Sequence, residues 1–203
     1  MGPTGAGKTT LALAIINRRT YQLVVATKPQ DPLISELTGD LGYKLVREWP
    51  PPPPQEVPEF RRVCYWPPIE RVEDVANQKV AIGNMLQSLY VTGGWTVYLD
   101  EVRYVTQYLK LAPAVELLWQ QGRSLNLSIM AATQRPRHIP LSAYSQATHL
   151  FLWRDNDEEN IRRLSGLGAA DKVTVQFAVM NLAKHEVLYV NTRTGELYVT
   201  KVA

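Results

Sequence analysis

The chain has 203 residues, of which 45% are hydrophobic and 20% charged, a composition that predicts one globular domain with a sizeable core. No apolar run reaches the roughly 18 residues that a membrane-spanning helix needs, so we expect no membrane span. The net charge of +3 permits a polyanionic partner without requiring one. A lone cysteine, Cys64, cannot form an internal disulfide, which favours a reducing, cytoplasmic location.

The first residues form a glycine-rich motif. The run Gly2-Pro3-Thr4-Gly5-Ala6-Gly7-Lys8-Thr9 fits the pattern G-x-x-x-x-G-K-[ST], and the apolar residues 11–16 predict a helix after it. Glycine-rich backbone lets successive amide N–H groups point at a phosphate, and the helix N-terminus adds partial positive charge. The motif predicts that residues Gly2 to Thr10 bind ATP, with Lys8 at the β- and γ-phosphates and the Thr9 hydroxyl on Mg²⁺. The alternative is a glycine-rich turn before a helix.

The next apolar run, residues 23–26, predicts a buried strand. Farther along, eight of the 14 prolines lie between Pro50 and Pro68. The run from Pro50 to Pro54 must be extended, because each proline ring fixes φ and removes a hydrogen-bond donor. We interpret residues 50–68 as a stiff surface insert, and the alternative is a ligand for an aromatic-grooved module.

Four apolar residues then recur at the spacing of a helix face: Ile82, Met85, Leu86 and Leu89. We expect Gly93-Gly94 to end this helix and residues 96–99 to form a strand that leads into Asp100 and Glu101. Asp100 would hold Mg²⁺ through water, and Glu101 would orient the water that attacks the γ-phosphate. The alternative is a solvated strand end. A carboxylate aimed at water favours hydrolysis over transfer to a small acceptor.

A further helix around residues 115–119 is expected to end near Gly122. The strand predicted over residues 128–133 leads into the polar Gln134, and Pro136 forces a break two residues later. This placement predicts that the Gln134 amide senses the γ-phosphate, with an ordinary polar turn as the alternative.

The last part of the chain predicts one strand, one short helix and one hairpin. Residues 150–153 are expected to form a buried strand. Asp155 and Glu158 have the spacing of a capping pair and predict a helix that stops at Gly166. Alternating residues around a Thr-Gly turn predict a β-hairpin over about 186–202.

With these elements in this order, the chain resembles the FtsK/HerA class of RecA-like P-loop ATPases, which pump DNA. The resemblance runs from Gly2 to about Leu167, and three segments carry it: Asp100-Glu101, Gly122-Arg123, and Ala132-Thr133-Gln134-Arg135-Pro136. It implies a three-layer α/β sandwich with a mainly parallel central sheet, formed by residues 1–203 as a single P-loop ATPase domain. It also implies Mg²⁺-dependent ATP hydrolysis that drives translocation or packaging of double-stranded DNA.

The resemblance further implies a homo-oligomeric ring, commonly a hexamer, in which an arginine of one subunit completes the neighbour's site. Arg123 matches that position, and a solvated cation at a helix end is the alternative. Arg103, Arg135 and Arg137 are weaker candidates for this task or for contacts with DNA. Lys28 follows the strand 23–26 in a Thr-Lys-Pro order that is similar to the family's Asp-Pro-Lys, and we assign it no fixed role.

A motor that moves along any sequence holds DNA phosphates through basic side chains and loop amides. The candidates for lining such a channel are Arg135, Arg137, His138, Arg162 and Arg163. Arg162-Arg163 is more simply interpreted as an exposed helix face beside acidic residues. The three histidines are too scattered to form a zinc site with one cysteine.

One feature departs from the family pattern. A phosphate-binding loop ordinarily follows a buried strand, and only Met1 stands before Gly2. We expect either that a first strand lies upstream of this sequence or that the sheet lacks this strand, which would leave backbone groups of its neighbours without partners.

Two alternative functions stay open. An FtsK-like secretion ATPase would push polypeptides, and DNA would neither bind to it nor stimulate it. A nucleotide-binding scaffold would bind ATP without turnover. A nucleoside or metabolite kinase is disfavoured, because Glu101, Gln134 and Arg123 would each need another role.

Overall fold

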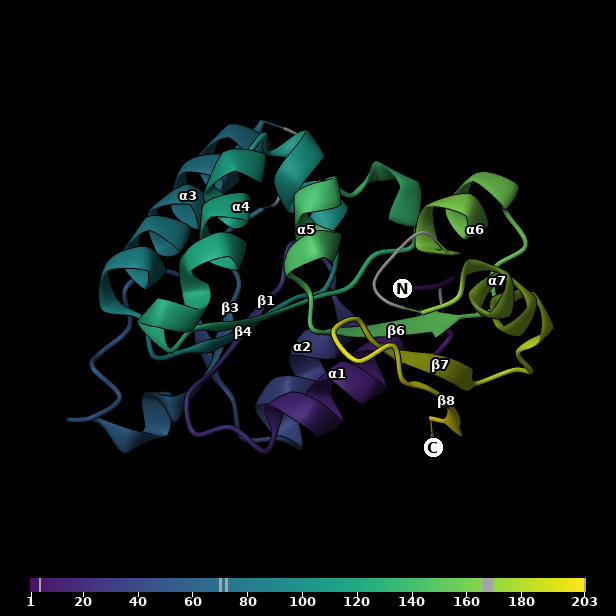
Figure 1. Cartoon of the computed structure of the whole chain (residues 1–203). Helices are drawn as coiled ribbons and strands as arrows, with labels where there is room; N and C mark the ends of the chain where they lie inside the picture. The colour runs from purple at the N-terminus through teal and green to yellow at the C-terminus, as the bar shows by residue number, and fades with distance from the viewer. Residues whose placement is uncertain (4, 70, 72, 166–169, 203) are drawn as a thin grey trace. The chain divides into compact units, whose positions relative to one another are not determined.

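The computed structural model describes residues 1–3, 5–69, 71, 73–165 and 170–202. The chain forms two compact units. We call Ala12–Ala131 the central unit, and Met1–Leu11 together with Ala132–Ala203 the terminal unit. Helix α1 (Lys8–Ile16) begins in the terminal unit and ends in the central unit (Figure 1). The sequence predicts a single domain, and the joint action of the two units as one ATPase domain stays a prediction.

The central unit contains a five-stranded parallel sheet in the order β2-β3-β1-β4-β5. Its strands are β1 (Gln22–Val25), β2 (Lys44–Val46), β3 (Arg62–Tyr65), β4 (Thr96–Leu99) and β5 (Ser128–Ala131). Every residue of β1 and β4 is buried, as expected for strands covered on both faces. The prediction of a mainly parallel central sheet is confirmed.

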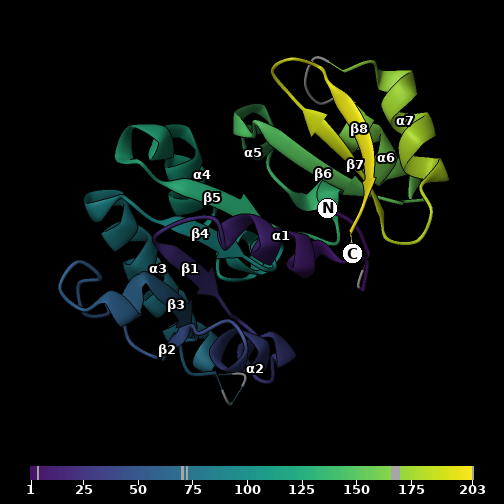
Figure 2. The same cartoon turned by 90° about the horizontal axis from the view of Figure 1, so that it is seen from below.

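Helices α3 (Asp74–Thr92) and α4 (Ala112–Gln121) pack on one face of this sheet, and α2 (Pro32–Gly39) lies on the other (Figures 1 and 2). The four apolar residues predicted to form the buried face of a helix are buried on α3. Gly93 ends α3 with a φ of 61°, a left-handed value that favours glycine. Among the described residues, no helix combines the length and the apolar character needed to cross a membrane.

The proline-rich stretch contains a strand of the central sheet. Strand β3 lies within residues 50–68 and pairs with β1 on one side and with β2 on the other. Val63, Cys64 and Tyr65 are almost completely buried. The interpretation of residues 50–68 as a surface insert is therefore wrong for this part, because the prolines flank the strand and leave its hydrogen bonds intact.

The terminal unit contains a three-stranded antiparallel sheet in the order β6-β7-β8. Its strands are β6 (His149–Trp153), β7 (Glu186–Asn191) and β8 (Leu197–Lys201), and the β7–β8 pair confirms the predicted C-terminal hairpin. Helices α6 (Glu158–Ser165) and α7 (Lys172–Asn181) pack against each other beside this sheet (Figure 2). The short helix α5 (Leu141–Gln146) precedes β6.

The predicted start of α6 is wrong by two residues. The Asp157 carboxylate accepts a hydrogen bond from Asn160 N at 3.0 Å, which makes Asp157 the N-cap of this helix. Asp155 instead accepts from Asp157 N at 2.9 Å and supports the turn before the helix. The predicted helix end at Gly166 lies outside the described residues.

Buried acidic groups of the central unit predict a loss of stability at alkaline pH. Burial raises the pKa values of Tyr43, Cys64 and Tyr65 to about 12, from ordinary values of 10.0 for tyrosine and 9.0 for the thiol. Between about pH 9 and pH 12 the unfolded chain releases protons that the folded chain retains, so the free energy of unfolding falls as pH rises. In an alkaline titration, the circular dichroism signal of the folded chain should therefore disappear over the same pH range in which the last tyrosines ionise, as followed by tyrosinate absorbance. Complete tyrosine ionisation before any loss of the folded signal would contradict this prediction.

Candidate nucleotide-binding site

The glycine-rich loop leads directly into α1. Gly5 and Gly7 have φ values of 72° and 91°, which side chains rarely adopt. Gly7 O accepts a hydrogen bond from Leu11 N at 3.0 Å, so the helical hydrogen-bond pattern starts at the end of the loop. Thr9 and Thr10 therefore lie in the first turn of α1, where the dipole of the helix favours an anion. Thr4, a predicted nucleotide-binding residue, lies outside the described residues.

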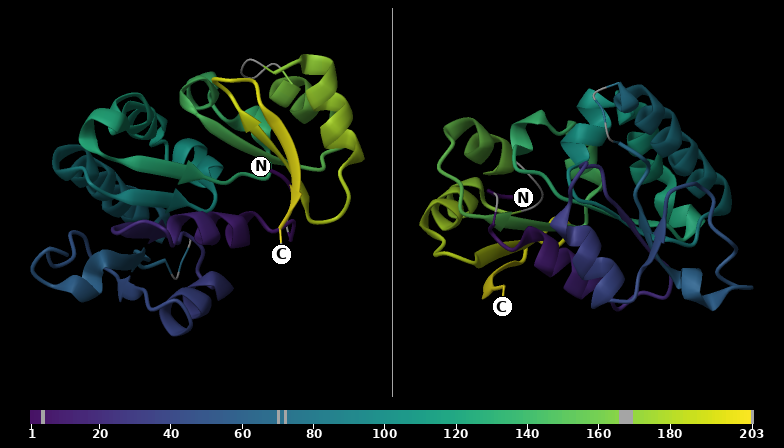
Figure 3. Two further views of the ribbon diagram at one scale, coloured as in Figure 1. Left: turned by 60° about the horizontal axis from the view of Figure 1, so that its bottom comes forward. Right: turned by 180° about the vertical axis from the view of Figure 1, so that it is seen from behind.

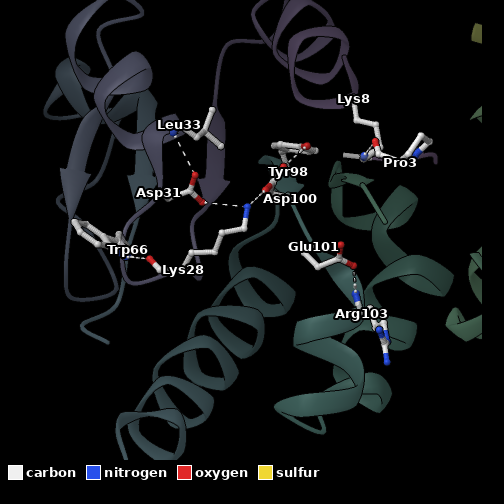
Figure 4. A network of polar contacts seen from close by, with 10 residues as sticks. All are labelled: Pro3, Lys8, Lys28, Asp31, Leu33, Trp66, Tyr98, Asp100, Glu101 and Arg103. Carbon is white, nitrogen blue, oxygen red and sulfur yellow. Dashed lines mark hydrogen bonds and ion pairs between the residues drawn. The ribbon is translucent and has the colours of Figure 1, made fainter. Parts of the chain in front are cut away.

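The Lys8 side chain turns back over the loop. Its ammonium group donates hydrogen bonds to Gly2 O at 2.7 Å and to Pro3 O at 2.6 Å, and Figure 4 shows the contact with Pro3. These contacts hold a positive charge beside the loop backbone. This is the location in which a P-loop lysine meets the phosphates of a nucleotide.

Segments distant in sequence support the loop from within the terminal unit. Met1 O accepts a hydrogen bond from Trp153 N at 2.9 Å, and Gly2 N donates to Thr133 O at 3.2 Å. A Cβ added to Gly7 would lie 3.2 Å from Val202 Cγ1, just after β8. Figure 3 shows β8 running toward the N-terminal segment. No strand precedes α1 in the described part of the chain, and Met1 and Gly2 pair with their neighbours through the contacts above.

Gln134 comes directly after the residue that pairs with Gly2. Thr133 Oγ1 accepts a hydrogen bond from Arg135 N at 3.1 Å, which turns the chain at this point. The backbone thus brings Gln134 beside the start of the loop, with its side chain exposed. Its role as a γ-phosphate sensor stays a prediction.

Asp100 and Glu101 follow the carboxyl end of β4, the edge at which parallel sheets bind ligands. The Tyr98 hydroxyl donates to Asp100 Oδ1 at 2.8 Å, and Lys28 Nζ donates to Asp100 Oδ2 at 3.0 Å. Glu101 Oε1 accepts from Arg103 N at 3.3 Å. Figure 4 shows these contacts together. The two carboxylates lie where the sequence predicts them, at the end of a buried strand.

The chemistry of Asp100 fits a hard divalent cation. Its carboxylate oxygens are the ligand type that Mg²⁺ prefers, and the Lys28 ammonium already places a positive charge 3.0 Å from one of them. Among the described residues, no group of three or more His, Cys, Asp or Glu side chains could hold a metal ion. Mg²⁺ needs no such group, because it is usually bound by one or two carboxylates together with water and substrate phosphates.

Sequence analysis missed the residues around Lys28. Trp66 Nε1 donates to Lys28 O at 2.9 Å, and Gln78 Nε2 donates to Thr27 O at 3.2 Å. The buried Asp31 lies 3.7 Å from Lys28 Nζ. Burial by itself lowers the pKa of Lys28, but the hydrogen bond and charge of Asp100, with a contribution from Asp31, hold that pKa above its ordinary value. The available signal was a lysine within three residues of a buried strand and directly before a proline.

Arg123 lies far from Asp100 of the same chain. It belongs to the 3-10 helix η3 (Gly122–Leu125), which sits at the amino end of β4 because Gly94 N donates to Leu125 O at 2.9 Å. Asp100 follows the opposite end of this four-residue strand, about 13 Å away along the strand direction. Arg123 is exposed, and the fold does not bring it close to Asp100 of the same chain.

Four other arginines of the candidate lists make contacts within the chain. Arg103 Nε donates to Gln107 Oε1 at 3.0 Å, and Arg137 forms an ion pair with Glu159. The remaining contacts are Arg162 with Glu158 at 3.6 Å and Arg163 with Ile139 O at 2.7 Å. The Arg162 contact supports the interpretation as an exposed helix face, and Arg135 is exposed.

A glycine-rich loop at the start of a helix, a lysine over that loop, and a parallel strand ending in two acidic residues define a P-loop NTPase fold. No protein-family model matches the chain. The chain is 22% identical over 188 residues to the DNA packaging ATPase P9 of Enterobacteria phage PRD1. The matched region covers 89% of this chain and 74% of that protein.

Solved structures share this fold. The genome packaging NTPase B204 from Sulfolobus turreted icosahedral virus 2, in complex with ATP-gammaS, matches with a TM-score of 0.70 and 14% identity over 98% of this chain and 93% of that chain. The cytoplasmic domain of the Thermomonospora curvata type VII secretion ATPase EccC matches with a TM-score of 0.64 and 15% identity, over 100% of this chain and 24% of that chain. The chain therefore has an α/β P-loop NTPase fold like those of B204 and EccC, with the mainly parallel central sheet that the sequence predicts.

The close approach of Val202 to Gly7 predicts that nucleotide binding is sensitive to a methyl group there. In Gly7→Ala, the left-handed φ of 91° and the contact with Val202 should strain the loop. Left-handed backbone costs about 1–2 kcal/mol for a residue with a side chain. The free loop of the variant should relax out of this conformation and must return to it to bind phosphate, so the dissociation constant of a fluorescent ATP analogue should rise roughly 5- to 30-fold.

Gly39→Ala is the matched control, because Gly39 ends α2 and a Cβ there would meet no heavy atom within 4 Å. Its nucleotide affinity should equal that of the wild type. Equal affinities for Gly7→Ala and Gly39→Ala would show that the loop does not bind the nucleotide.

Proposed function

We propose that this chain is the ATP-hydrolysing subunit of a motor that packages or translocates double-stranded DNA. The observation that carries the proposal is the loop geometry, with Lys8 folded onto Gly2 and Pro3 at the head of α1. Support for the cargo comes from the likeness to the DNA packaging ATPase P9 and the genome packaging NTPase B204.

Each predicted residue has a defined task in this reaction. The loop amides and Lys8 bind the phosphates of ATP, while Thr9 and Asp100 hold Mg²⁺. When bound, Mg²⁺ neutralises charge on the β- and γ-phosphates. Glu101 orients the attacking water and accepts its proton as the bond to the γ-phosphorus forms and ADP leaves. Gln134 donates a hydrogen bond from its amide to the γ-phosphate.

Replacing Glu101 with glutamine tests this chemistry, because the amide keeps the size of the side chain but cannot accept the proton. ATP turnover should fall by roughly 10²- to 10⁴-fold, the range for loss of a general base, while binding of a fluorescent ATP analogue stays unchanged. Wild-type turnover should require Mg²⁺ and should rise with linear duplex DNA.

The exposed Glu56→Gln is the control for this variant and should turn over ATP like the wild type. Unchanged turnover in Glu101→Gln would overturn the assignment of the base. Wild-type protein that binds ATP without hydrolysing it would instead identify a nucleotide-binding scaffold.

A second candidate function is secretion of polypeptides, and the match to the secretion ATPase EccC favours it. The two functions differ in their response to nucleic acid. A secretion ATPase should hydrolyse ATP at the same rate with and without duplex DNA, and duplex DNA should not bind to it in an electrophoretic shift assay.

The separation of Arg123 from Asp100 supports a ring, commonly a hexamer, in which Arg123 completes the site of a neighbouring subunit. An arginine that neutralises transition-state charge across an interface is worth about 10³- to 10⁵-fold in rate. Arg123→Ala and Lys8→Ala should each abolish turnover alone. A mixture of the two proteins should recover part of it, because some interfaces then combine an intact Lys8 with an intact Arg123.

Arg61→Ala, at another exposed arginine, should retain full activity by itself. If the mixture of Arg123→Ala and Lys8→Ala is no more active than its separate components, Arg123 does not act across an interface.

A further inference from the structure

The carboxylate of Asp100 accepts a hydrogen bond on each oxygen. Tyr98 donates to Oδ1 at 2.8 Å and Lys28 donates to Oδ2 at 3.0 Å, as Figure 4 shows. The Asp100 side chain is only 14% exposed, whereas that of Lys28 is 50% exposed. The oxygens proposed to hold a cation thus already face a cation supplied by the chain itself.

The backbone of Lys28 is held firmly, while its side chain has room to move. Trp66 Nε1 binds Lys28 O at 2.9 Å and Gln78 Nε2 binds Thr27 O at 3.2 Å. Gln78 is completely buried, and its Oε1 accepts a hydrogen bond from the Tyr104 hydroxyl at 2.7 Å. The lysine side chain, with its flexible four-carbon stem, can therefore reorient without moving the backbone that carries it.

A second acceptor lies within reach of the same ammonium group. Asp31 Oδ1 caps α2 by accepting from Leu33 N at 3.2 Å. Asp31 Oδ2 lies 3.7 Å from Lys28 Nζ and accepts no hydrogen bond from any described residue. The Asp31 side chain is only 4% exposed, and within the described part of the chain this buried oxygen has the Lys28 ammonium at ion-pair distance but no hydrogen bond, an arrangement that is rare in proteins. A small movement of Lys28 would satisfy it.

We propose that Lys28 is an internal counter-cation of Asp100 that competes with the divalent metal and moves to Asp31 when the metal binds. This inference rests on the proposed function, because it takes Asp100 as the metal ligand. Two cations at one carboxylate repel each other, so metal binding requires Lys28 to withdraw. Lys28 and Asp31 together set the concentration of divalent cation at which Asp100 becomes occupied.

The proposal requires opposite effects from two substitutions. Lys28→Met removes the competing charge and should strengthen metal binding. Asp31→Asn keeps the helix cap, since asparagine caps as well as aspartate, but removes the charge that receives Lys28. It should therefore weaken metal binding.

The test measures Mn²⁺ binding to the nucleotide-free protein from the electron paramagnetic resonance signal of unbound Mn²⁺, a readout independent of ATP turnover. The Mn²⁺ dissociation constant should fall about fivefold in Lys28→Met and rise in Asp31→Asn, because a partly exposed ion pair is worth up to about a fivefold change in an equilibrium constant. Lys28→Arg, which keeps the positive charge, should stay close to the wild type. Asp100→Asn should lose the site.

Lys44→Met is the matched control, because Lys44 forms an exposed ion pair of 3.0 Å with Glu59 away from Asp100. Its Mn²⁺ affinity should equal that of the wild type. Circular dichroism of each variant distinguishes a change in affinity from a loss of fold, and Lys28→Gln provides a second neutral variant.

Equal Mn²⁺ affinities in the wild type, Lys28→Met and Lys28→Gln would overturn the proposal even if ATP hydrolysis is intact. Wild-type Mn²⁺ binding no stronger than that of Asp100→Asn would also overturn it. Failure of the proposed function gives a different result, because the wild type then hydrolyses no ATP at any Mg²⁺ concentration.

Discussion

The parallel register of the central sheet is the constraint on which the candidate site depends. Val25 pairs with both Tyr65 and Leu99, and Leu99 pairs with Ala131, so four strands end in one row. Residues that follow these strands, among them Lys28, Trp66 and Asp100, therefore emerge at one edge of the sheet. A strand buried on both faces cannot shift without leaving backbone groups unpaired, and this cost fixes the positions of the side chains beyond its end.

One ammonium group is shared by two carboxylates at this edge of the sheet. Asp31, Asp100 and Glu101 bring three carboxylates, and Lys28 is the ammonium group in contact with two of them. Burial opposes the charged form of Lys28, but the carboxylates outweigh it and raise its pKa.

The phosphate-binding loop depends on support from the other end of the chain. Gly5 and Gly7 have no side chains with which to pack the loop, so its conformation is held by neighbours. Val202 lies 3.2 Å from where a Cβ on Gly7 would be, and Trp153 N donates a hydrogen bond to Met1 O. The sheet formed by β6 and the C-terminal hairpin therefore also supports the loop. A Cβ at Gly7 would press on Val202 in addition to adopting an unfavourable φ.

The sequence by itself determined the features that are local in the chain. The glycine-rich loop with Lys8, the periodic face of α3, and the apolar strand before Asp100 each follow from neighbouring residues, because φ preferences and burial periodicity act over short distances. The sequence did not reveal β3, because the prolines on both sides of this four-residue strand favour an extended surface segment. It also did not reveal the role of Lys28, since Asp100 lies 72 residues away along the chain. Only the tertiary structure decided that contact, because the pairing of β1 with β4 brings the ends of two distant strands to one edge.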